Sequence, residues 1–376
     1  MEKIIISKLN EVFLKIDSSR ATTKELKEFF VCKAPNFMFH PMYKSGVWNG
    51  NLYYFNTVDH TLPIGLLPKL IKFCQQYGYE YEFNFSKKDF GDTVTEEFMD
   101  KFYEYTFPPE ANIFPRDYQQ EATLAGLNSG RCVLELCTSS GKSVIIYSLI
   151  RYMLAKGIDV LLVVPTVSLV EQMYSDFQDY GWKDLDKYVD KLYSGQKTSD
   201  KKVLISTWQS IHKRDISFFS RFGALLCDET HTLSGLSLQD IAKKCTKAKY
   251  RIGLTGTMPK EEANRMTIEG YLGPVSYVLK AKELMDRDII SQLQIKNLLM
   301  KYPNDLRIAR PSYQQEVHDI LEYQERNKAL EYIIDRSADG HNSLILLHRI
   351  EHLRIVKEYL EKNFPNHIIY DIFGDP

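Results

Sequence analysis

Short apolar runs alternate with longer helical runs through residues 113–280. The apolar runs, rich in Val, Leu and Ile, are RCVLEL, DVLLVV, KVLIST, GALLCDE and YRIGLTG. The segments KSVIIYSLIRYMLA and VSLVEQMYSDFQDYG separate the first three of them. Nearly continuous apolar strands separated by helices are typical of a parallel sheet that is covered on both faces. The pattern therefore predicts an α/β domain with a parallel sheet over residues 113–280.

The flanking regions show different patterns. Residues 1–88 combine short apolar runs with two helical segments, TTKELKEFFVCK and LPIGLLPKLIKFCQQYG, which predicts a small α+β domain. Residues 89–112 are acidic and contain Pro108 and Pro109, which is typical of a linker. In residues 281–376, the runs NSLILLH and HIIYDIFG lie on either side of a helical segment and predict the start of a second α/β domain.

Composition narrows the class of protein. The chain has 376 residues, of which 44% are hydrophobic, so it can form two or three hydrophobic cores. No apolar run reaches the length of a membrane span, and six cysteines without a CxxC pair favour a reducing compartment. These features predict a cytoplasmic protein. The formal net charge of -1 neither indicates nor excludes a nucleic-acid partner.

The segment LCTSSGKS, residues 136–143, has the Gly-Lys-Ser ending of a phosphate-binding loop. It lies between a predicted strand and a predicted helix, where backbone N–H groups and the helix N-terminus can face a polyphosphate. Lys142 would then reach the β- and γ-phosphates and Ser143 would bind Mg²⁺. The alternative is a chance GKS at the start of a helix.

A second motif, LLCDETH, places two adjacent carboxylates at the end of an apolar strand. Asp228 can hold a metal ion through water, and Glu229 can polarise an attacking water, which are the roles that phosphoryl transfer requires. A solvated turn is the alternative for Asp-Glu alone. Here the Asp-Glu pair follows a GKS loop and lies at the end of a separate strand, which favours the catalytic interpretation.

Two further segments are candidates for the same nucleotide site. RIGLTGT, residues 251–257, ends a predicted strand in small and hydroxyl residues that can relay between the acidic pair and a bound nucleic-acid strand. FPRDYQQEA places Arg116, Tyr118 and Gln119 before a helix, and a Gln amide can both donate to and accept from adenine. A polar helix start is the alternative for this segment.

In residues 1–88, the stretch YKSGVWNGNLYYF mixes basic and aromatic residues. Lys44, Tyr43, Trp48, Tyr53 and Tyr54 form a composition that is suited to stacking on unpaired bases. The alternative is that Trp48 and Tyr53 belong to the core of a β-hairpin that turns at Asn49-Gly50.

Seven motifs, taken in order, resemble the DExH branch of superfamily 2 helicases. They are RDYQ, TSSGKS, VVPTVSLVEQ, STWQS, DETH, LTGT and LILLHRIEH. The loop in that family commonly reads Pro-Thr-Gly before its Gly-Lys, so Cys137 and Ser139 depart from the pattern. The segments YKSGVWNGNLYYF and LPIGLLPKLIKFCQQYGY also resemble the leading domain of the bacteriophage UvsW-type helicases.

The resemblance implies a RecA-like motor domain, a partial second RecA-like domain and a leading DNA-binding domain. It implies ATP-dependent remodelling of branched DNA, with ATP and Mg²⁺ as cofactors, and a location in the host cytoplasm if the chain comes from a phage. We expect this chain alone to be poorly active. An RNA helicase, a restriction-type translocase of duplex DNA, a non-motor ATP-binding switch and a structural DNA-binding module remain alternatives. The oligomeric state is left open.

The site residues fall into five groups. Catalysis is assigned to Lys142, Asp228 and Glu229, and metal binding to Ser143 and Asp228. The nucleotide-binding set is Arg116, Tyr118, Gln119, Thr138, Ser139, Ser140, Gly141, Lys142 and Ser143. Coupling is assigned to His231, Thr255 and Thr257, and nucleic-acid contact to Thr166, Thr207, Gln209, Lys44 and Trp48.

The arginine finger and later motifs of this superfamily lie in the second motor domain and do not occur before the chain ends at IFGDP. We therefore expect that the sequence is part of a longer helicase, and that the arginine finger lies outside it.

Overall fold

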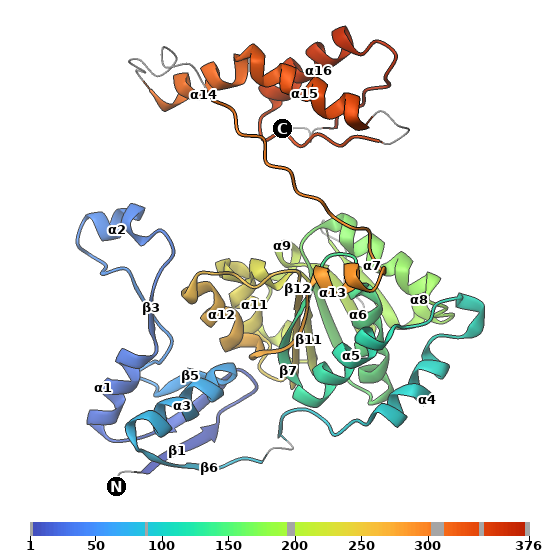
Figure 1. Cartoon of the computed structure of the whole chain (residues 1–376). Coiled ribbons are helices and arrows are strands. Elements are labelled where there is room, and N and C mark those ends of the chain that lie inside the picture. The colour runs from blue at the N-terminus through green and yellow to red at the C-terminus, as the bar shows by residue number, and fades with distance from the viewer. Residues whose placement is uncertain (1–2, 87–88, 194–199, 302–311, 338–341, 373–376) are drawn as a thin grey trace. The chain divides into compact units, whose positions relative to one another are not determined.

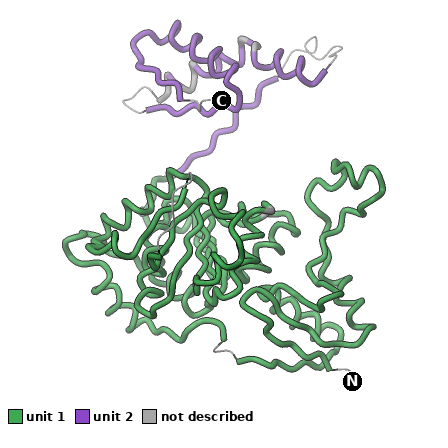
Figure 2. Tube along the Cα trace, turned by 180° about the vertical axis from the view of Figure 1, so that it is seen from behind, with its two compact units in different colours: residues 1–292 green, residues 293–376 purple. Residues whose placement is uncertain are grey.

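The computed structural model describes residues 3–86, 89–193, 200–301, 312–337 and 342–372. The chain divides into two compact units, Met1–Gln292 and Leu293–Pro376 (Figure 2). The first unit contains both the leading domain and the large α/β domain. Each unit is described by itself below.

The α/β domain is built on a seven-stranded sheet in which every neighbouring pair is parallel, as the sequence predicts. In sheet order the strands are β13 (Val275–Leu279), β7 (Arg131–Leu136), β12 (Tyr250–Thr255), β11 (Ala224–Cys227), β8 (Val160–Val164), β10 (Val203–Thr207) and β9 (Val189–Leu192). Because all seven run in one direction, their carboxyl ends form one edge of the sheet.

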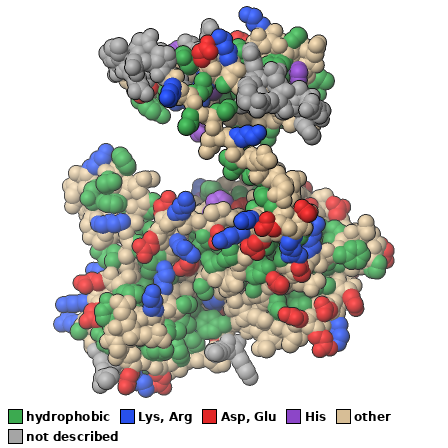
Figure 3. Space-filling model, in the orientation of Figure 1, with side chains coloured by type: hydrophobic (Ala, Val, Ile, Leu, Met, Phe, Trp, Pro, Cys, Tyr) green, Lys and Arg blue, Asp and Glu red, His purple; other side chains and the backbone are tan. Residues whose placement is uncertain are grey.

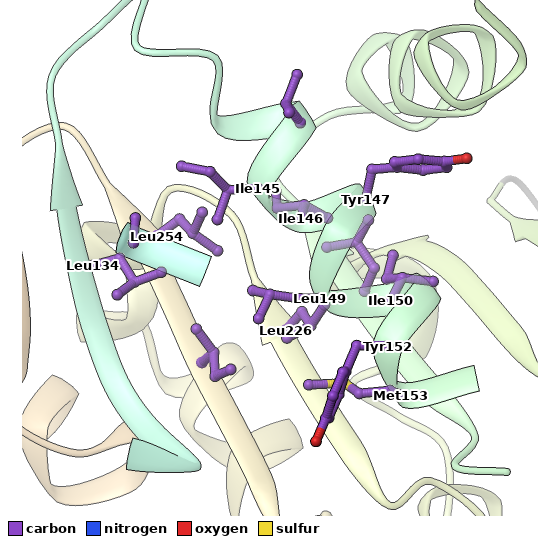
Figure 4. Close-up of a cluster of buried hydrophobic side chains, with 14 of the residues drawn as sticks. Leu134, Ile145, Ile146, Tyr147, Leu149, Ile150, Tyr152, Met153, Leu226 and Leu254 are labelled. Carbon is purple, nitrogen blue, oxygen red and sulfur yellow. The ribbon is translucent and has the colours of Figure 1, made fainter. Parts of the chain in front are cut away.

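Helices cover both faces of this sheet (Figure 1). Along β7, Leu134 packs into the core on one face and Val133 into the core on the other, as the two-residue period of a strand requires. On the Leu134 face lie α5 (Asp117–Ser129), α6 (Lys142–Ala155), α7 (Val167–Asp179) and α8 (Leu185–Tyr188). On the Val133 face lie α9 (Trp208–Ile211), α10 (Ile216–Phe219), α11 (Leu236–Lys244) and α12 (Glu262–Leu272). Figure 4 shows the α6 side chains packed against strand residues such as Leu134 and Leu254.

The leading domain is the expected small α+β domain. Its four-stranded sheet has the order β5 (Thr61–Pro63), β2 (Phe13–Asp17), β1 (Lys3–Lys8) and β6 (Glu80–Phe83). Helices α1 (Arg20–Phe29) and α3 (Leu67–Tyr77), with the 3₁₀ turn η2 (Ile64–Leu66), contribute to its core. The left-handed Gly78 ends α3.

A two-stranded ribbon projects from this domain, and it differs from the alternative of a hairpin that turns at Asn49-Gly50. Strand β4 (Asn51–Tyr53) pairs with β3 (Val31–Lys33), and the connection carries η1 (Phe37–Phe39) and α2 (Pro41–Lys44). Asn49 instead closes a local turn, because its side chain accepts a hydrogen bond from the Asn51 backbone N–H. The alternative of a hairpin that turns at Asn49-Gly50 is therefore wrong.

The acidic segment 89–112 is a folded part of the first unit and not a free linker. It contains α4 (Glu96–Thr106) and η4 (Pro109–Ala111). Met99, Tyr103 and Thr106 follow helical spacing and are buried against the α/β domain, so the acidic residues mark only the outer face of a packed helix. At the start of segment 89–112, Asp92 accepts hydrogen bonds from Tyr152, Lys156 and Tyr250 and so fixes the segment to the α/β domain.

The leading domain packs closely against α12. The hydroxyl of Tyr54 donates to the Ala263 carbonyl at 2.7 Å, so this tyrosine is a packing residue. A Cβ on Gly65 would lie 1.9 Å from the Glu269 carbonyl oxygen, which explains glycine there. Arg131 at the start of β7 donates to the Glu11 carboxylate at 2.7 Å and fixes the two domains from a second side.

The second unit begins at residue 293, not at 281. Helix α13 (Ala281–Asp286) belongs to the first unit, where Leu284 is fully buried and Arg287 pairs with Asp117 at 2.7 Å. The second unit contains α14 (Tyr313–Glu322), α15 (Gln324–Ser337) and α16 (Ile350–Asn363) around a small core of Ile334, Val356 and Leu360.

The expected strands NSLILLH and HIIYDIFG do not form within the described residues of this unit. Leu344 and Leu346 are 83% and 84% exposed, and Ile368 and Tyr370 are exposed as well. An apolar run becomes a strand only when a neighbouring strand accepts its backbone hydrogen bonds. The last residues of the second run, 373–376, lie outside the described residues. Among the described residues, no helix combines the length and apolar character needed to cross a membrane.

A fully buried arginine holds the helices behind the centre of the sheet. On β12, Arg251 donates from Nε to the Tyr271 carbonyl at 2.6 Å, from Nη1 to Cys245 at 3.0 Å and from Nη2 to Ala242 at 2.6 Å. These carbonyls lie at the C-terminal ends of α11 and α12, where the helix dipole favours a cation.

We predict that Arg251→Met lowers the free energy of unfolding of the first unit by at least about 3 kcal/mol, because three buried carbonyls lose charge-assisted donors. Urea denaturation followed by circular dichroism measures this free energy of unfolding. Arg265→Met, which removes an exposed arginine from α12, is the control and should change stability by less than about 1 kcal/mol. Equal effects of the two substitutions would contradict the assigned role.

Candidate functional site

The phosphate-binding segment forms a tight loop between β7 and α6. Ser139 has φ +65° and Gly141 has φ +77°, so the chain enters the left-handed region twice within three residues. Ser140 is fully buried and Thr138 and Ser139 are exposed. Lys142 and Ser143 then begin α6, where the first backbone N–H groups have no partners within the helix. This is the strand, loop and helix arrangement that the sequence predicts.

The RDYQ segment lies against this loop. Gln119 is buried, and its Nε2 donates to the Ser140 carbonyl at 2.9 Å while its Oε1 accepts from the Arg116 N–H at 2.8 Å. Gln119 therefore braces the loop, and adenine recognition by it remains a prediction. Tyr118 is also buried, and Arg287 lies 5.6 Å from the centre of its ring.

The two carboxylates of the DETH motif follow β11 and meet the loop lysine. Glu229 has φ +51°, and its Oε1 lies 3.7 Å from Lys142 Nζ. Asp228 is buried, and among the described residues no group hydrogen-bonds to its Oδ1. Burial, and then the neighbouring charge of Glu229, raise the pKa of Asp228 to about 6. A nearby cation would therefore stabilise its charged form.

The motifs on β11 and β12 are joined by hydrogen bonds because these strands are neighbours. His231 Nδ1 lies 3.2 Å from Glu229 Oε2 and 3.2 Å from Thr255 Oγ1. The Thr255 hydroxyl also contacts the Thr257 carbonyl at 3.2 Å. Successive contacts therefore connect three predicted motifs at one edge of the sheet: the phosphate-binding loop, DETH and LTGT. They run from Lys142 through Glu229 and His231 to Thr255.

The groups present fit a magnesium nucleotide. Asp228 Oδ1 and Ser140 Oγ are buried and have no hydrogen-bond partner among the described residues, so they are suited to a cation and a polar ligand, respectively. Among the described residues, no group of three or more His, Cys, Asp and Glu side chains can hold a metal ion alone. Proteins usually bind Mg²⁺ through one or two carboxylates together with substrate phosphates, and Asp228 supplies such a carboxylate.

The Ser143 hydroxyl has a partner that sequence reasoning missed. Ser143 Oγ lies 2.7 Å from the hydroxyl of Tyr180, at the end of α7, and also interacts with Asp176. Tyr180 is 37 residues downstream, and no motif or spacing marks it. Only the packing of α7 against α6 brings the two together.

The nucleic-acid residues on the α/β domain lie at the same sheet edge but differ in exposure. Thr166 is exposed and caps α7, accepting a hydrogen bond from the Leu169 N–H, and Gln209 is exposed on α9. Thr207 is buried, and its hydroxyl lies 2.9 Å from that of Ser210. Thr207 is thus placed to orient the start of α9.

Lys44 and Trp48 lie on the projecting segment between β3 and β4. Lys44 is exposed, whereas Trp48 is half-buried and donates from Nε1 to the Asn51 carbonyl at 3.0 Å. Phe39 and Val47 on the same segment are 71% and 73% exposed. Figure 3 shows hydrophobic and basic side chains together on this segment.

Comparisons with known proteins agree with this arrangement. The family profile "Type III restriction enzyme, res subunit" matches residues 112–260, and "DNA helicase UvsW, N-terminal" matches residues 6–84. The ATP-dependent DNA helicase uvsW of Enterobacteria phage T4 is 28% identical over 380 residues, covering 96% of this chain and 73% of that protein. This chain is a UvsW-like superfamily 2 helicase.

Solved structures of T4 UvsW have the same fold. One is 29% identical with a TM-score of 0.67 and covers 73% of this chain and 99% of its own. Another, 23% identical with a TM-score of 0.66, covers 96% of this chain and 73% of its own and supports the fold alone. The resemblance inferred from the motifs, including the RecA-like fold class, is therefore confirmed.

Within this UvsW-like helicase we predict opposite responses at the two left-handed positions of the loop. Ser139→Gly should retain nucleotide binding and thermal stability, because Ser139 is exposed and glycine adopts positive φ freely. Gly141→Ala should weaken nucleotide binding at least about ten-fold, because positive φ is strained for alanine and the new Cβ would lie 2.3 Å from Gln119 Nε2. Fluorescent-nucleotide titration and thermal melting compare the two variants, and equal responses would refute this account.

Proposed function

We propose that this chain is an ATP-dependent DNA helicase or translocase that remodels branched DNA, such as forks and recombination intermediates. The observation that carries the proposal is the connected set of Lys142, Glu229, His231 and Thr255 at the carboxyl edge of a parallel sheet. Its T4 relative is named as an ATP-dependent DNA helicase.

In the proposed nucleotide site each residue has a distinct role. Lys142, which lies 3.7 Å from Glu229, would exchange this carboxylate for the β- and γ-phosphates. Ser143 and Asp228 would hold Mg²⁺, which, when bound, neutralises charge on the phosphates. Glu229 would accept a hydrogen bond from the attacking water and orient it. Gln119 and Gly141 would keep the loop backbone open to the phosphates.

Coupling to DNA would run through the shared edge of β11 and β12. A change at Glu229 on nucleotide turnover alters the charge beside His231, and His231 contacts Thr255 at 3.2 Å. Thr257, exposed two residues later, would pass this change to the following segment. The two strands are adjacent in register, so a small movement on one reaches the other directly.

DNA contact would combine the sheet edge with the projecting segment. Thr166 and Gln209 can bond to phosphates without reading sequence, with Thr207 orienting α9 from behind. Lys44 and the aromatic residues near Trp48 would meet bases that are unpaired at a junction, where stacking is independent of sequence. This combination supports branched DNA as the substrate.

We predict different defects for two substitutions in the nucleotide site. Lys142→Ala should reduce DNA-stimulated ATP turnover at least about 100-fold, because it removes a cation from the phosphates. Glu229→Gln should still bind ATP but turn it over about 10² to 10⁴ times more slowly, since an amide cannot activate water. Measuring ATPase rates and nucleotide affinity on the full chain separates the two. Wild-type turnover by Lys142→Ala, or no ATP binding by Glu229→Gln, would contradict these assignments.

We predict that Trp48→Ala weakens binding to forked DNA about five- to 100-fold but leaves duplex DNA binding within about two-fold, because stacking contributes about 1 to 3 kcal/mol per unpaired base. Fluorescence anisotropy with forked DNA, duplex DNA and RNA of equal length measures this preference. Trp48→Phe should restore it, and Val58→Ala, at an exposed site outside the segment, is the control. Equal losses on fork and duplex, or preferential binding of RNA, would overturn the substrate assignment.

A further inference from the structure

Two side chains on α7 engage the serine that begins α6. Ser143 Oγ lies 2.7 Å from the Tyr180 hydroxyl. The Asp176 carboxyl lies near Ser143 as well: burial raises the pKa of Asp176, and the Ser143 hydroxyl partly offsets this rise. Tyr180 is the C-terminal capping residue of α7, and its backbone N–H donates to the Asp176 carbonyl. Both partners therefore belong to one helix end, and neither is part of a recognised motif.

The Tyr180 hydroxyl is held in place by aromatic packing. Its ring centre lies 5.3 Å from that of Tyr147 and 6.1 Å from that of Phe107, and the residue is buried. A buried ring between two others cannot swing away without opening the core. Ser143, at the first turn of α6 and only part-buried, is the side that can rotate.

The bonds to α7 occupy the hydroxyl of Ser143. A serine has one O–H donor and two lone pairs, and a carboxylate can only accept. In the bond between Ser143 and Tyr180 either hydroxyl can be the donor, so this bond uses either the O–H or one lone pair of Ser143. Among the described residues, no group hydrogen-bonds to Oδ1 of Asp228, so Ser143 does not bond to this oxygen of the proposed metal-binding carboxylate. The hydroxyl is engaged by α7 and not by Oδ1 of Asp228.

We propose that Tyr180 is a positioning residue that holds Ser143 away from the metal-binding arrangement, so that magnesium-nucleotide binding must exchange the Tyr180 bond for the metal. The inference rests on the proposed function, because it takes Ser143 as a magnesium ligand. In this arrangement, nucleotide binding changes a contact at the C-terminal end of α7. Thr166, which is proposed to contact DNA, lies at the start of the same helix.

The test is nucleotide binding by Tyr180→Phe in the full chain, measured with a fluorescent non-hydrolysable ATP analogue in Mg²⁺ and in EDTA. Loss of one hydrogen bond that competes with the metal should tighten binding in Mg²⁺ about three- to ten-fold. Binding in EDTA should stay unchanged, because no metal then draws Ser143 away. Tyr147→Phe is the matched control: it removes a buried hydroxyl from the same aromatic cluster, and that hydroxyl contacts Thr106 and Arg151.

A second comparison tests whether the effect passes through Ser143. In a Ser143→Ala background, Tyr180→Phe should no longer change binding in Mg²⁺. An equal tightening in that background, or unchanged or weaker binding of the single variant in Mg²⁺, would overturn the inference. Thermal melting checks that each variant is folded.

A crystal structure of the wild-type chain with Mg²⁺ and the analogue gives a readout that needs no substitution. The distance from Ser143 Oγ to the Tyr180 hydroxyl should lengthen beyond hydrogen-bonding range, and retention of the contact would overturn the inference. The two proposals fail separately. A wild-type chain without magnesium-dependent nucleotide binding would overturn the proposed function, whereas normal wild-type binding with no response to Tyr180→Phe would overturn this inference alone.

Discussion

The buried guanidinium of Arg251 is the interaction on which the rest of the first unit depends. A charged group without water requires several well-placed acceptors, and the carbonyls at the ends of α11 and α12 supply them. This requirement fixes the two helices against β12. Helix α12 in turn carries the leading domain, which reaches it through Tyr54 and the close approach at Gly65. One strand residue therefore sets the position of both the helical layer and the leading domain.

The same strand sets the geometry of the site. Strand β12 lies between β7, which precedes the phosphate-binding loop, and β11, which precedes the acidic pair. Its register with both neighbours brings Thr255 beside Glu135 on β7 and Gly253 beside Cys227 on β11. Residues that follow these strands then meet at one edge, as parallel sheets generally place their ligands. Lys142, Glu229 and His231 come together for this reason, although 89 positions separate the first from the last.

The sequence predicts the parts of this fold that depend on local pattern. Nearly continuous apolar runs indicated the parallel strands, and the GKS ending indicated the loop, because both features are written in consecutive residues. Features that depend on tertiary packing were not predicted. The acidic character of residues 89–112 concealed α4, whose buried face has only Met99, Tyr103 and Thr106. The partnership of Ser143 with Tyr180 depends on how α7 crosses α6, which no spacing encodes. The expected strands of the second unit failed because an apolar run does not specify its partner.

The loop also shows why a family pattern of glycines is not a reliable guide to where glycine is required. Ser139 and Gly141 both have positive φ, so backbone conformation alone would favour glycine at each. Ser139 faces solvent, and the cost of its conformation is limited to local backbone strain of about 1 kcal/mol. At Gly141 the space for a Cβ is taken by the Gln119 amide, which is fixed by its bonds to Arg116 and Ser140. The neighbouring motif, more than the backbone angle, therefore decides which glycine the loop can replace. A helicase loop that lacks one family glycine can in this way keep the geometry of a phosphate site.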